Sequence, residues 1–257
     1  MKFSTTKPKY MHLIATYICL LPLLLLMNCK QDPDMEPDPE VIPNILVFSK
    51  TAGFRHASIP EGVKMFNEMA ADSSMTIVHS EDAAIFNHHS LSDFDIVVFL
   101  STTGTILNAD QKNTFQQYIE AGGKFLGIHS ATDTEYDWPW FGEMVGARFN
   151  GHPHIQEARL ETTNNQHPAI MGMPAEWNHT DEYYNFRDLQ SDNTTLVLVD
   201  ESTYEGGTNG DFHPISWCKP VKEGKMFYTA LGHTDECFSD TLFRQHIKTA
   251  IAWLLSK

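Results

Sequence analysis

The sequence is poor in three features that would each point to a class of protein. It has four cysteines in 257 residues, too few for a miniprotein held together by disulfide bonds. It has 18 basic against 33 acidic residues, so a nucleic acid or an anionic membrane surface would repel it. Its apolar run at residues 11–27 is broken by His12, Thr16 and Pro22 and is too short for a membrane-spanning helix.

Histidine, in contrast, is abundant. The chain has thirteen histidines, and all but His12 follow residue 28. Histidine is the usual side chain for metal ligation and for proton transfer near neutral pH. With 42% hydrophobic residues and five tryptophans, the chain can also bury a sizeable core, which argues against global disorder. We therefore expect one compact domain with a histidine-rich site.

The N-terminus has the layout of an export signal. Residues 1–10 are basic, the apolar run follows, and together they predict a signal peptide over residues 1–28. The run ends in Leu26-Met27-Asn28-Cys29, which resembles a bacterial lipobox, although most lipoboxes carry a small residue where Asn28 stands. In that interpretation Cys29 becomes the lipidated first residue of the mature protein. The alternative is an ordinary signal peptide with a chance cysteine.

The segment after Cys29 predicts a tether. Residues 30–40 hold five acids and three prolines, and such a composition does not pack. We expect an acidic, proline-rich tether over residues 29–43 and a folded domain over residues 44–257. The acidic stretch loosely resembles the surface-export signal of Bacteroidetes lipoproteins. The expected location is therefore the cell envelope, with a lipid anchor in the outer membrane, on its periplasmic or surface side. Cys218 and Cys237 would then either pair or stay reduced.

From residue 43 onward, short apolar runs alternate with helix-like segments, and no internal repeat is visible. Helices are predicted from Pro60, from a cap at Asn108 or Asp110 to Gly122, and over 241–255. Strands are predicted over 45–49, 75–79, 95–100, 124–129, 158–162, 196–200, 215–218 and 226–231. Apolar strands separated by helices indicate a doubly wound α/β fold with a mostly parallel sheet.

Polar residues gather where predicted strands end. His56 follows the first strand, Thr103 the third, His129 the fourth and His233 the last. Ligands bind at the carboxyl ends of strands in such sheets. The segment at residues 178–184 (NHTDEYY) combines acids, an imidazole and phenols, as a site with acid/base groups or oxygen ligands would.

The segment Gly127-Ile128-His129-Ser130-Ala131 has the form of a nucleophile elbow, with histidine at the apex. A thiol mechanism is disfavoured because neither Cys218 nor Cys237 lies in such a turn. His129 is either a metal ligand or a general acid/base. Trp138, with Trp140 beside it, lines a sugar-binding cleft or packs in the core.

The ordered landmarks of the chain resemble those of the ThuA-like, or trehalose utilisation, family. They are Gly53-Phe54-Arg55-His56, Ser58-Ile59-Pro60, Gly127 to Ala131, Phe149 to Pro153, His167-Pro168, Asp181-Glu182-Tyr183-Tyr184, Pro214 to Trp217 and Gly232-His233. The resemblance implies a single-domain, flavodoxin-like sandwich similar to class I glutamine amidotransferases. It also implies that His129 replaces the amidotransferase cysteine, which argues against glutaminase activity.

The resemblance also implies a set of site residues. The catalytic candidates are His129, Glu182, His56 and Asp181, and the substrate-binding candidates are Arg55, Thr103, Tyr184 and His233. The aromatic argument above, and not the resemblance, adds Trp138 to the substrate-binding candidates. A divalent ion such as zinc would be held by His56, His129, His233 and Glu182. None of these four has HxH or HExxH spacing, so the metal stays one of two alternatives, beside pure acid/base catalysis.

The family name implies an exported enzyme of trehalose or glucoside utilisation that acts on an oxidised, 3-keto sugar. A keto group acidifies the neighbouring C–H, so His129 or Glu182 would remove that proton while Arg55, a histidine or a metal ion stabilises the enediolate. Isomerisation or glycosidic cleavage would follow. The alternatives are a non-catalytic saccharide-binding lipoprotein and a purely structural surface protein. The expected partner is a small carbohydrate, with no nucleic acid and with membrane contact through the anchor only; the oligomeric state is left open.

Overall fold

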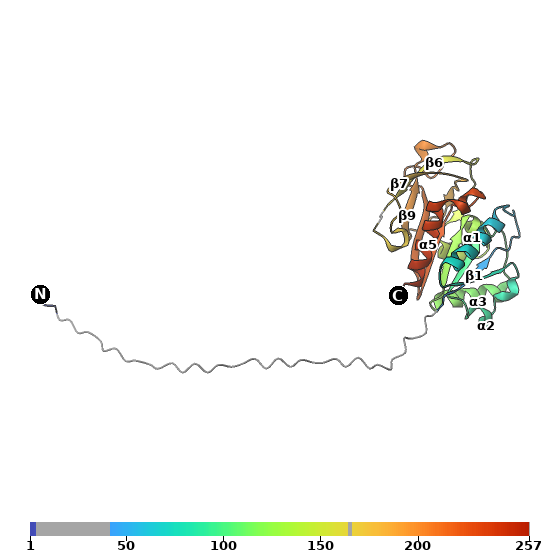
Figure 1. Ribbon diagram of the computed structural model, residues 1–257, viewed down its shortest axis with the longest axis horizontal. Coiled ribbons are helices and arrows are strands. Elements are labelled where there is room, and N and C mark those ends of the chain that lie inside the picture. Colours follow the sequence, from blue (N-terminus) through green and yellow to red (C-terminus); the bar gives the residue numbers. More distant parts are fainter. Residues whose placement is uncertain (4–41, 164–165, 257) are drawn as a thin grey trace. The chain divides into compact units, whose positions relative to one another are not determined.

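The structure is a computed structural model that describes residues 1–3, 42–163 and 166–256 (Figure 1). Almost all of the expected signal peptide and of the tether, including Cys29, lies outside these residues. Within the described part of the chain, no helix combines the length and the apolar character needed to cross a membrane.

A nine-stranded sheet forms the centre of the domain, in the order β2-β1-β3-β4-β11-β10-β9-β6-β7. Neighbours among the first five strands are parallel, and the remaining neighbours are antiparallel. The strands are β1 (Asn44–Phe48), β2 (Thr76–Ser80), β3 (Ile96–Leu100), β4 (Lys124–Ile128), β6 (Gln156–Thr162), β7 (Glu176–Asp181), β9 (Thr194–Val199), β10 (Pro214–Val221) and β11 (Gly224–Thr229). All eight strands expected from apolar runs are present. The additional strand, β7, is polar because it lies at the sheet edge.

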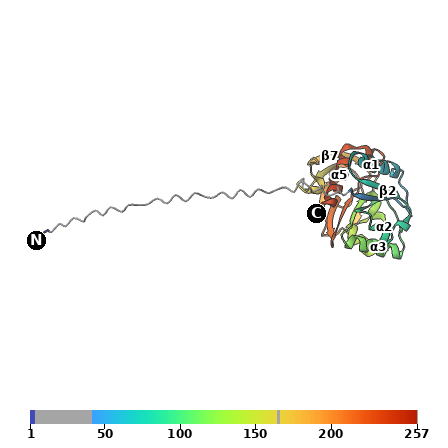
Figure 2. The same cartoon turned by 60° about the horizontal axis from the view of Figure 1, so that its bottom comes forward.

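Helices cover both faces of the parallel half of the sheet. Neighbouring residues of a strand point to opposite faces, so one strand contacts a helix on each side. On β3, the Phe99 ring stacks on Phe115 of α3, whereas Leu100 lies against Gly62 of α1. Figure 2 accordingly shows α1 and α5 on one side of the sheet and α2 and α3 on the other. The α-helices are α1 (Ile59–Asp72), α2 (His88–Leu91), α3 (Ala109–Glu120), α4 (Pro139–Val145) and α5 (Thr241–Leu255). The domain is therefore the expected α/β sandwich.

Local signals account for the start and end of α3. The Asn108 side chain accepts the backbone N–H of Gln111, whose own side chain accepts the N–H of Asn108. This reciprocal capping box makes Asn108 the cap, rather than Asp110. Gly122 follows the helix with a φ of 112°, a backbone conformation that glycine adopts without strain.

Short elements complete the loops around the sheet. The strands β5 (Arg148–Phe149) and β8 (Phe186–Arg187) form a two-stranded antiparallel sheet. It continues into backbone hydrogen bonds that join Asn150 and Gly151 to Asn185. The 3-10 helices are η1 (Ala83–Ile85), η2 (His129–Asp133), η3 (Pro168–Ile170), η4 (Glu201–Thr203) and η5 (Glu236–Ser239).

Both cysteines of the domain are buried, unpaired thiols. Cys218 lies on β10, where its Sγ is 3.9 Å from His167 Nε2. Cys237 lies in η5, with its Sγ 3.4 Å from His179 Nε2. Of the two alternatives that the sequence leaves open, the structure has the reduced one.

One histidine is buried within the core, at the interface between α5 and the sheet. His246 packs against the Phe227 ring, and its Nε2 lies 3.2 Å from Ser216 Oγ. Burial, together with the nearby His179, lowers the pKa of His246 to about 4. The folded protein thus resists a proton that the unfolded chain accepts at its ordinary pKa of 6.5.

This difference predicts acid sensitivity that a His246→Phe variant should lose. Because the pKa is lower in the folded state, stability falls as the pH drops from about 6.5 to about 4 and then levels off. Between about pH 6.5 and about pH 4, the difference in free energy of unfolding between H246F and the wild type should shift by about 3 kcal/mol in favour of H246F. Urea denaturation at several pH values measures the difference. His89→Gln, at an exposed position, should track the wild type, and an unchanged gap between H246F and the wild type would refute the prediction.

Candidate functional site

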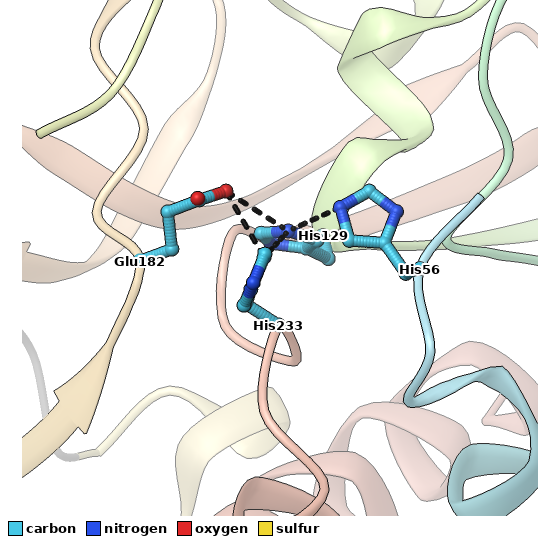
Figure 3. A group of neighbouring side chains, drawn as sticks. All are labelled: His56, His129, Glu182 and His233. Carbon is cyan, nitrogen blue, oxygen red and sulfur yellow. Dashed lines mark hydrogen bonds and ion pairs between the residues drawn. The ribbon is translucent and has the colours of Figure 1, made fainter. Parts of the chain in front are cut away.

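Four side chains from distant parts of the sequence meet at one point. They are His56 in the loop after β1, His129 at the end of β4, Glu182 directly after β7 and His233 in the loop after β11. Figure 3 shows the three imidazoles and the carboxylate directed toward one another. One ligand atom from each lies within 4.8 Å of all the others.

The separations between these atoms are those of a metal-binding site. His129 Nε2 lies 3.1 Å from His56 Nε2 and 3.1 Å from His233 Nδ1. Glu182 Oε2 is 3.0 Å from His233 Nδ1 and 3.6 Å from His129 Nε2. Ligands about 2.0–2.1 Å from a tetrahedral zinc ion are about 3.3 Å apart. These four separations are therefore compatible with shared ligation of a small divalent cation.

His129 occupies the apex of the expected elbow. Its φ is 52°, a left-handed conformation that is uncommon for a residue other than glycine. The turn lifts the imidazole off the end of β4, and its Nδ1 lies 2.8 Å from the carbonyl oxygen of Ala230. Since a carbonyl only accepts, Nδ1 carries the proton and Nε2 turns its lone pair toward the cluster.

His56 is held in place by Thr103. The Thr103 hydroxyl accepts the N–H of Gly53 and donates to the carbonyl of Phe54, while the Ala52 N–H donates to the Thr103 carbonyl. These bonds fix the loop that carries His56. The Thr103 side chain is therefore hydrogen-bonded to backbone groups of this loop and is not directed toward a substrate.

Asp181 has a similar supporting position. Its buried carboxylate accepts the N–H of Gly232 at 2.7 Å, of His233 at 3.0 Å and of Glu182 at 2.9 Å. One carboxylate therefore orients both loops that supply His233 and Glu182. Asp181 stands behind the cluster as a positioning residue and is not one of its four members.

Glu182 offers one oxygen to the cluster, and the other contacts His152. His152 Nδ1 lies 2.9 Å from Glu182 Oε1, and the His152 side chain is 41% exposed. The hydrogen bonds between residues 150–151 and Asn185 bring this loop to Glu182. The sequence analysis includes His152 only within the family landmark Phe149 to Pro153, because its proximity to Glu182 depends on the β5-β8 pairing, which no local pattern indicates.

Burial and mutual contacts shift the pKa values of the residues in the cluster. Burial and the adjacent His129 lower the pKa of His56 to about 3, which keeps its imidazole neutral. Burial favours the protonated form of Glu182, but its contacts with His129 and His233 outweigh this and lower the pKa to about 2. Burial also acts to lower the pKa of His233, yet the Glu182 carboxylate raises it overall. The neutral His56 imidazole and the ionised Glu182 carboxylate are in the forms that bind a divalent metal ion.

Of the remaining candidate residues, Tyr184 lies beside the cluster, whereas Arg55 and Trp138 lie outside it. Tyr184 packs its buried ring on His129, with centroids 4.3 Å apart. Arg55 instead forms an exposed ion pair with Glu81 at 2.7 Å. Trp138 stacks on Trp140 at 5.0 Å and, with Phe141, joins the aromatic contacts beside α3. The structure therefore does not bring Arg55 or Trp138 into the cluster.

An exposed aromatic ring that the sequence analysis did not select lies beside the cluster. Phe54 is 67% exposed, and its ring centroid is 4.9 Å from that of His56. An exposed phenylalanine next to buried polar groups is unusual for a surface position. The signal in the sequence was its place directly before Arg55 and His56.

The role of Asp181 predicts the effect of an Asp181→Asn variant. An asparagine keeps one acceptor oxygen but turns an NH₂ group toward N–H groups that now donate to the carboxylate. The free energy of unfolding should fall by about 1–3 kcal/mol, the cost of unpaired buried donors. Urea denaturation measures it. Asp211→Asn, at an exposed site, should be neutral, and equal stability of the two variants would contradict the assigned role.

Comparisons with known proteins agree with this architecture. A ThuA-like protein from Bacteroides uniformis has a TM-score of 0.72 at 22% identity, over 84% of this chain and 94% of its own. A ThuA-like protein from Parabacteroides merdae has a TM-score of 0.66 at 17% identity, over 84% and 92%. A cytoplasmic protein of Salmonella typhimurium has a TM-score of 0.61 at 11% identity, over 82% and 99%. At these identities the likeness shows the fold.

The family is settled by sequence. No curated protein matches the chain, but the family model ThuA, described as trehalose utilisation, matches residues 44–254. That match covers nearly the whole folded domain, including every member of the cluster. The chain therefore belongs to the ThuA, or trehalose utilisation, family, which lies in the glutamine amidotransferase-like superfamily.

Proposed function

We propose that the protein is a metal-dependent enzyme of sugar utilisation that acts on an oxidised, 3-keto sugar such as a 3-keto-glucoside. The single observation that carries the proposal is the convergence of three imidazoles and one carboxylate at the functional edge of the sheet. The family to which the chain belongs indicates a role in sugar utilisation.

The donor set fits a divalent transition metal. Imidazole with one carboxylate suits zinc, iron or nickel, whereas calcium and magnesium prefer oxygen ligands throughout. An ion held by His56, His129, His233 and Glu182 would act as a Lewis acid toward a keto oxygen. The structure favours this ligand role for His129 and Glu182 over the role of base. His129 Nδ1 is occupied by the Ala230 carbonyl, and Glu182 Oε1 by His152.

His152 is then the group that moves the proton. It is half exposed at the rim and hydrogen-bonded to Glu182, and imidazoles exchange protons near neutral pH. In a 3-keto-glucoside, His152 would take the proton from C2, and the electron pair would pass to the keto oxygen. Return of the pair expels the glycosidic oxygen from C1, which cleaves the bond; reprotonation of the carbon instead gives isomerisation.

Phe54 provides a surface for the sugar ring. The C–H face of a pyranose packs on an aromatic face, and Phe54 presents such a face beside His56. This arrangement takes the place of the Trp138 cleft that the sequence suggested, since Trp138 already packs against Trp140 and Phe141.

The proposal predicts metal-dependent turnover. Full-length protein treated with a chelator should not consume a 3-keto-glucoside, and zinc or another divalent ion should restore consumption, followed by NMR with trehalose as the non-oxidised comparison. His152→Asn should lower kcat by about 100-fold or more with the metal content unchanged.

The same loop supplies the matched control. His154 is exposed, two residues from His152, and His154→Asn should keep full activity. If the wild type binds the keto sugar in every metal form but never consumes it, the enzyme proposal fails and the saccharide-binding alternative replaces it.

We also propose that the protein is exported and anchored to the cell envelope through Cys29. Support comes from the sequence: a basic start, an apolar run, Leu26-Met27-Asn28-Cys29 and an acidic tether before β1. A lipid attached to Cys29 would account for all membrane contact.

Radioactive palmitate should label the wild type in growing bacteria, and Cys29→Ala should abolish the label and release the protein from the membrane fraction. Cys218→Ala, a change at a buried thiol of the domain, should label normally. Undiminished labelling of C29A would rule out this anchor.

A further inference from the structure

A second group of ligand-type side chains lies behind the first. His179 and Asp181 on β7 and Cys237 in η5 place Nε2, a carboxylate oxygen and Sγ within 4.8 Å of one another. All three residues are buried. Two residues apart on a strand point to the same face, which brings His179 and Asp181 together opposite Cys237.

The contacts converge on one ring nitrogen. His179 Nε2 lies 3.4 Å from Cys237 Sγ and 3.6 Å from Asp181 Oδ2. A catalytic relay of thiol, imidazole and carboxylate needs the two partners on opposite ring nitrogens, so this group is not a relay. Around a tetrahedral zinc ion, a sulfur and a nitrogen ligand are about 3.6 Å apart, and a nitrogen and an oxygen about 3.3 Å. The observed separations match those of ligands around a common ion.

Two members of the group, His179 and Cys237, line a cavity. A cavity of about 320 Å³ opens beside His179 and Cys237 and is lined further by Glu157, Asn178 and Asp240. Such a cavity has room for a hydrated ion to enter and for a water molecule to complete its coordination.

We propose that His179, Asp181 and Cys237 form a second, thiolate-containing site for a zinc-type divalent ion. One imidazole, one carboxylate and one thiolate are ligands that zinc accepts, and the thiol proton leaves to solvent when the ion binds. The first cluster contains no sulfur, so the two sites differ in chemistry.

The second site supports the first through Asp181. The same carboxylate accepts the N–H groups of Gly232 and His233. An ion bound to Asp181 would fix the end of β7 to η5 and, through these bonds, the loop that presents His233. Its role is therefore structural, and its existence does not depend on the proposed enzymatic activity.

Cobalt distinguishes the two sites, because a thiolate ligand gives Co²⁺ an intense near-ultraviolet charge-transfer band that nitrogen and oxygen ligands do not. Metal-free, full-length wild type titrated with Co²⁺ should develop this band, and Zn²⁺ should remove it. Cys237→Ser should abolish the band. It should also lower the Co²⁺ affinity of this site by more than about 100-fold, because loss of a group that only contacts a ligand already lowers metal affinity by about 10- to 100-fold. His129→Asn should keep the band and lose visible absorption from the first cluster.

Cys218→Ser is the matched control, because Cys218 also lies near a histidine, His167, and its variant should keep the band. His179→Gln is the second variant at the site and should also lose it. The visible absorption of the first cluster and a cooperative thermal transition of the metal-free protein verify that C237S is folded. Absence of the band at saturating Co²⁺ in the wild type, or its persistence in folded C237S, would overturn the second site. Loss of keto-sugar turnover with the band intact would affect only the proposed function.

Discussion

The buried carboxylate of Asp181 is the constraint on which the candidate site depends. It accepts three backbone N–H groups, from Glu182, Gly232 and His233. Burial of an ionised carboxylate costs several kcal/mol unless hydrogen bonds compensate it, and these three bonds supply the compensation. The end of β7 is thereby joined to the loop after β11, about fifty residues away. These hydrogen bonds therefore hold together the two segments that carry Glu182 and His233.

The geometry also requires the sheet to curl. β4 and β7 are separated by five strand positions in the sheet order, which in a flat sheet would be about 24 Å. Glu182 Oε2 nevertheless lies 3.6 Å from His129 Nε2, so the antiparallel extension must bend back over the carboxyl ends of the parallel strands. The parallel half thus supplies histidines, and the extension supplies the acid.

The elbow after β4 has the shape of a nucleophile elbow but carries an imidazole at its apex. The left-handed turn at His129 aims one side chain at the top of the sheet, as a nucleophile elbow does. An imidazole in that position, with Nδ1 bound to a carbonyl, offers a single lone pair to its surroundings. This is the requirement for a metal ligand, and it differs from that of an attacking group.

The sequence by itself indicated most of the fold and named all four residues of the main cluster, Glu182 through the family resemblance. Apolar runs predicted eight strands, because a parallel sheet buried on both faces leaves a continuous hydrophobic signal. The rule that functional groups follow strands selected His56, His129 and His233. Only the tertiary structure decided the rest. The polar edge strand β7 has no apolar run to mark it, and its pairing alone directs Asp181 inward to backbone N–H groups and Glu182 toward the histidines. His152 and Cys237 likewise depend on contacts between distant segments, which a local pattern cannot encode.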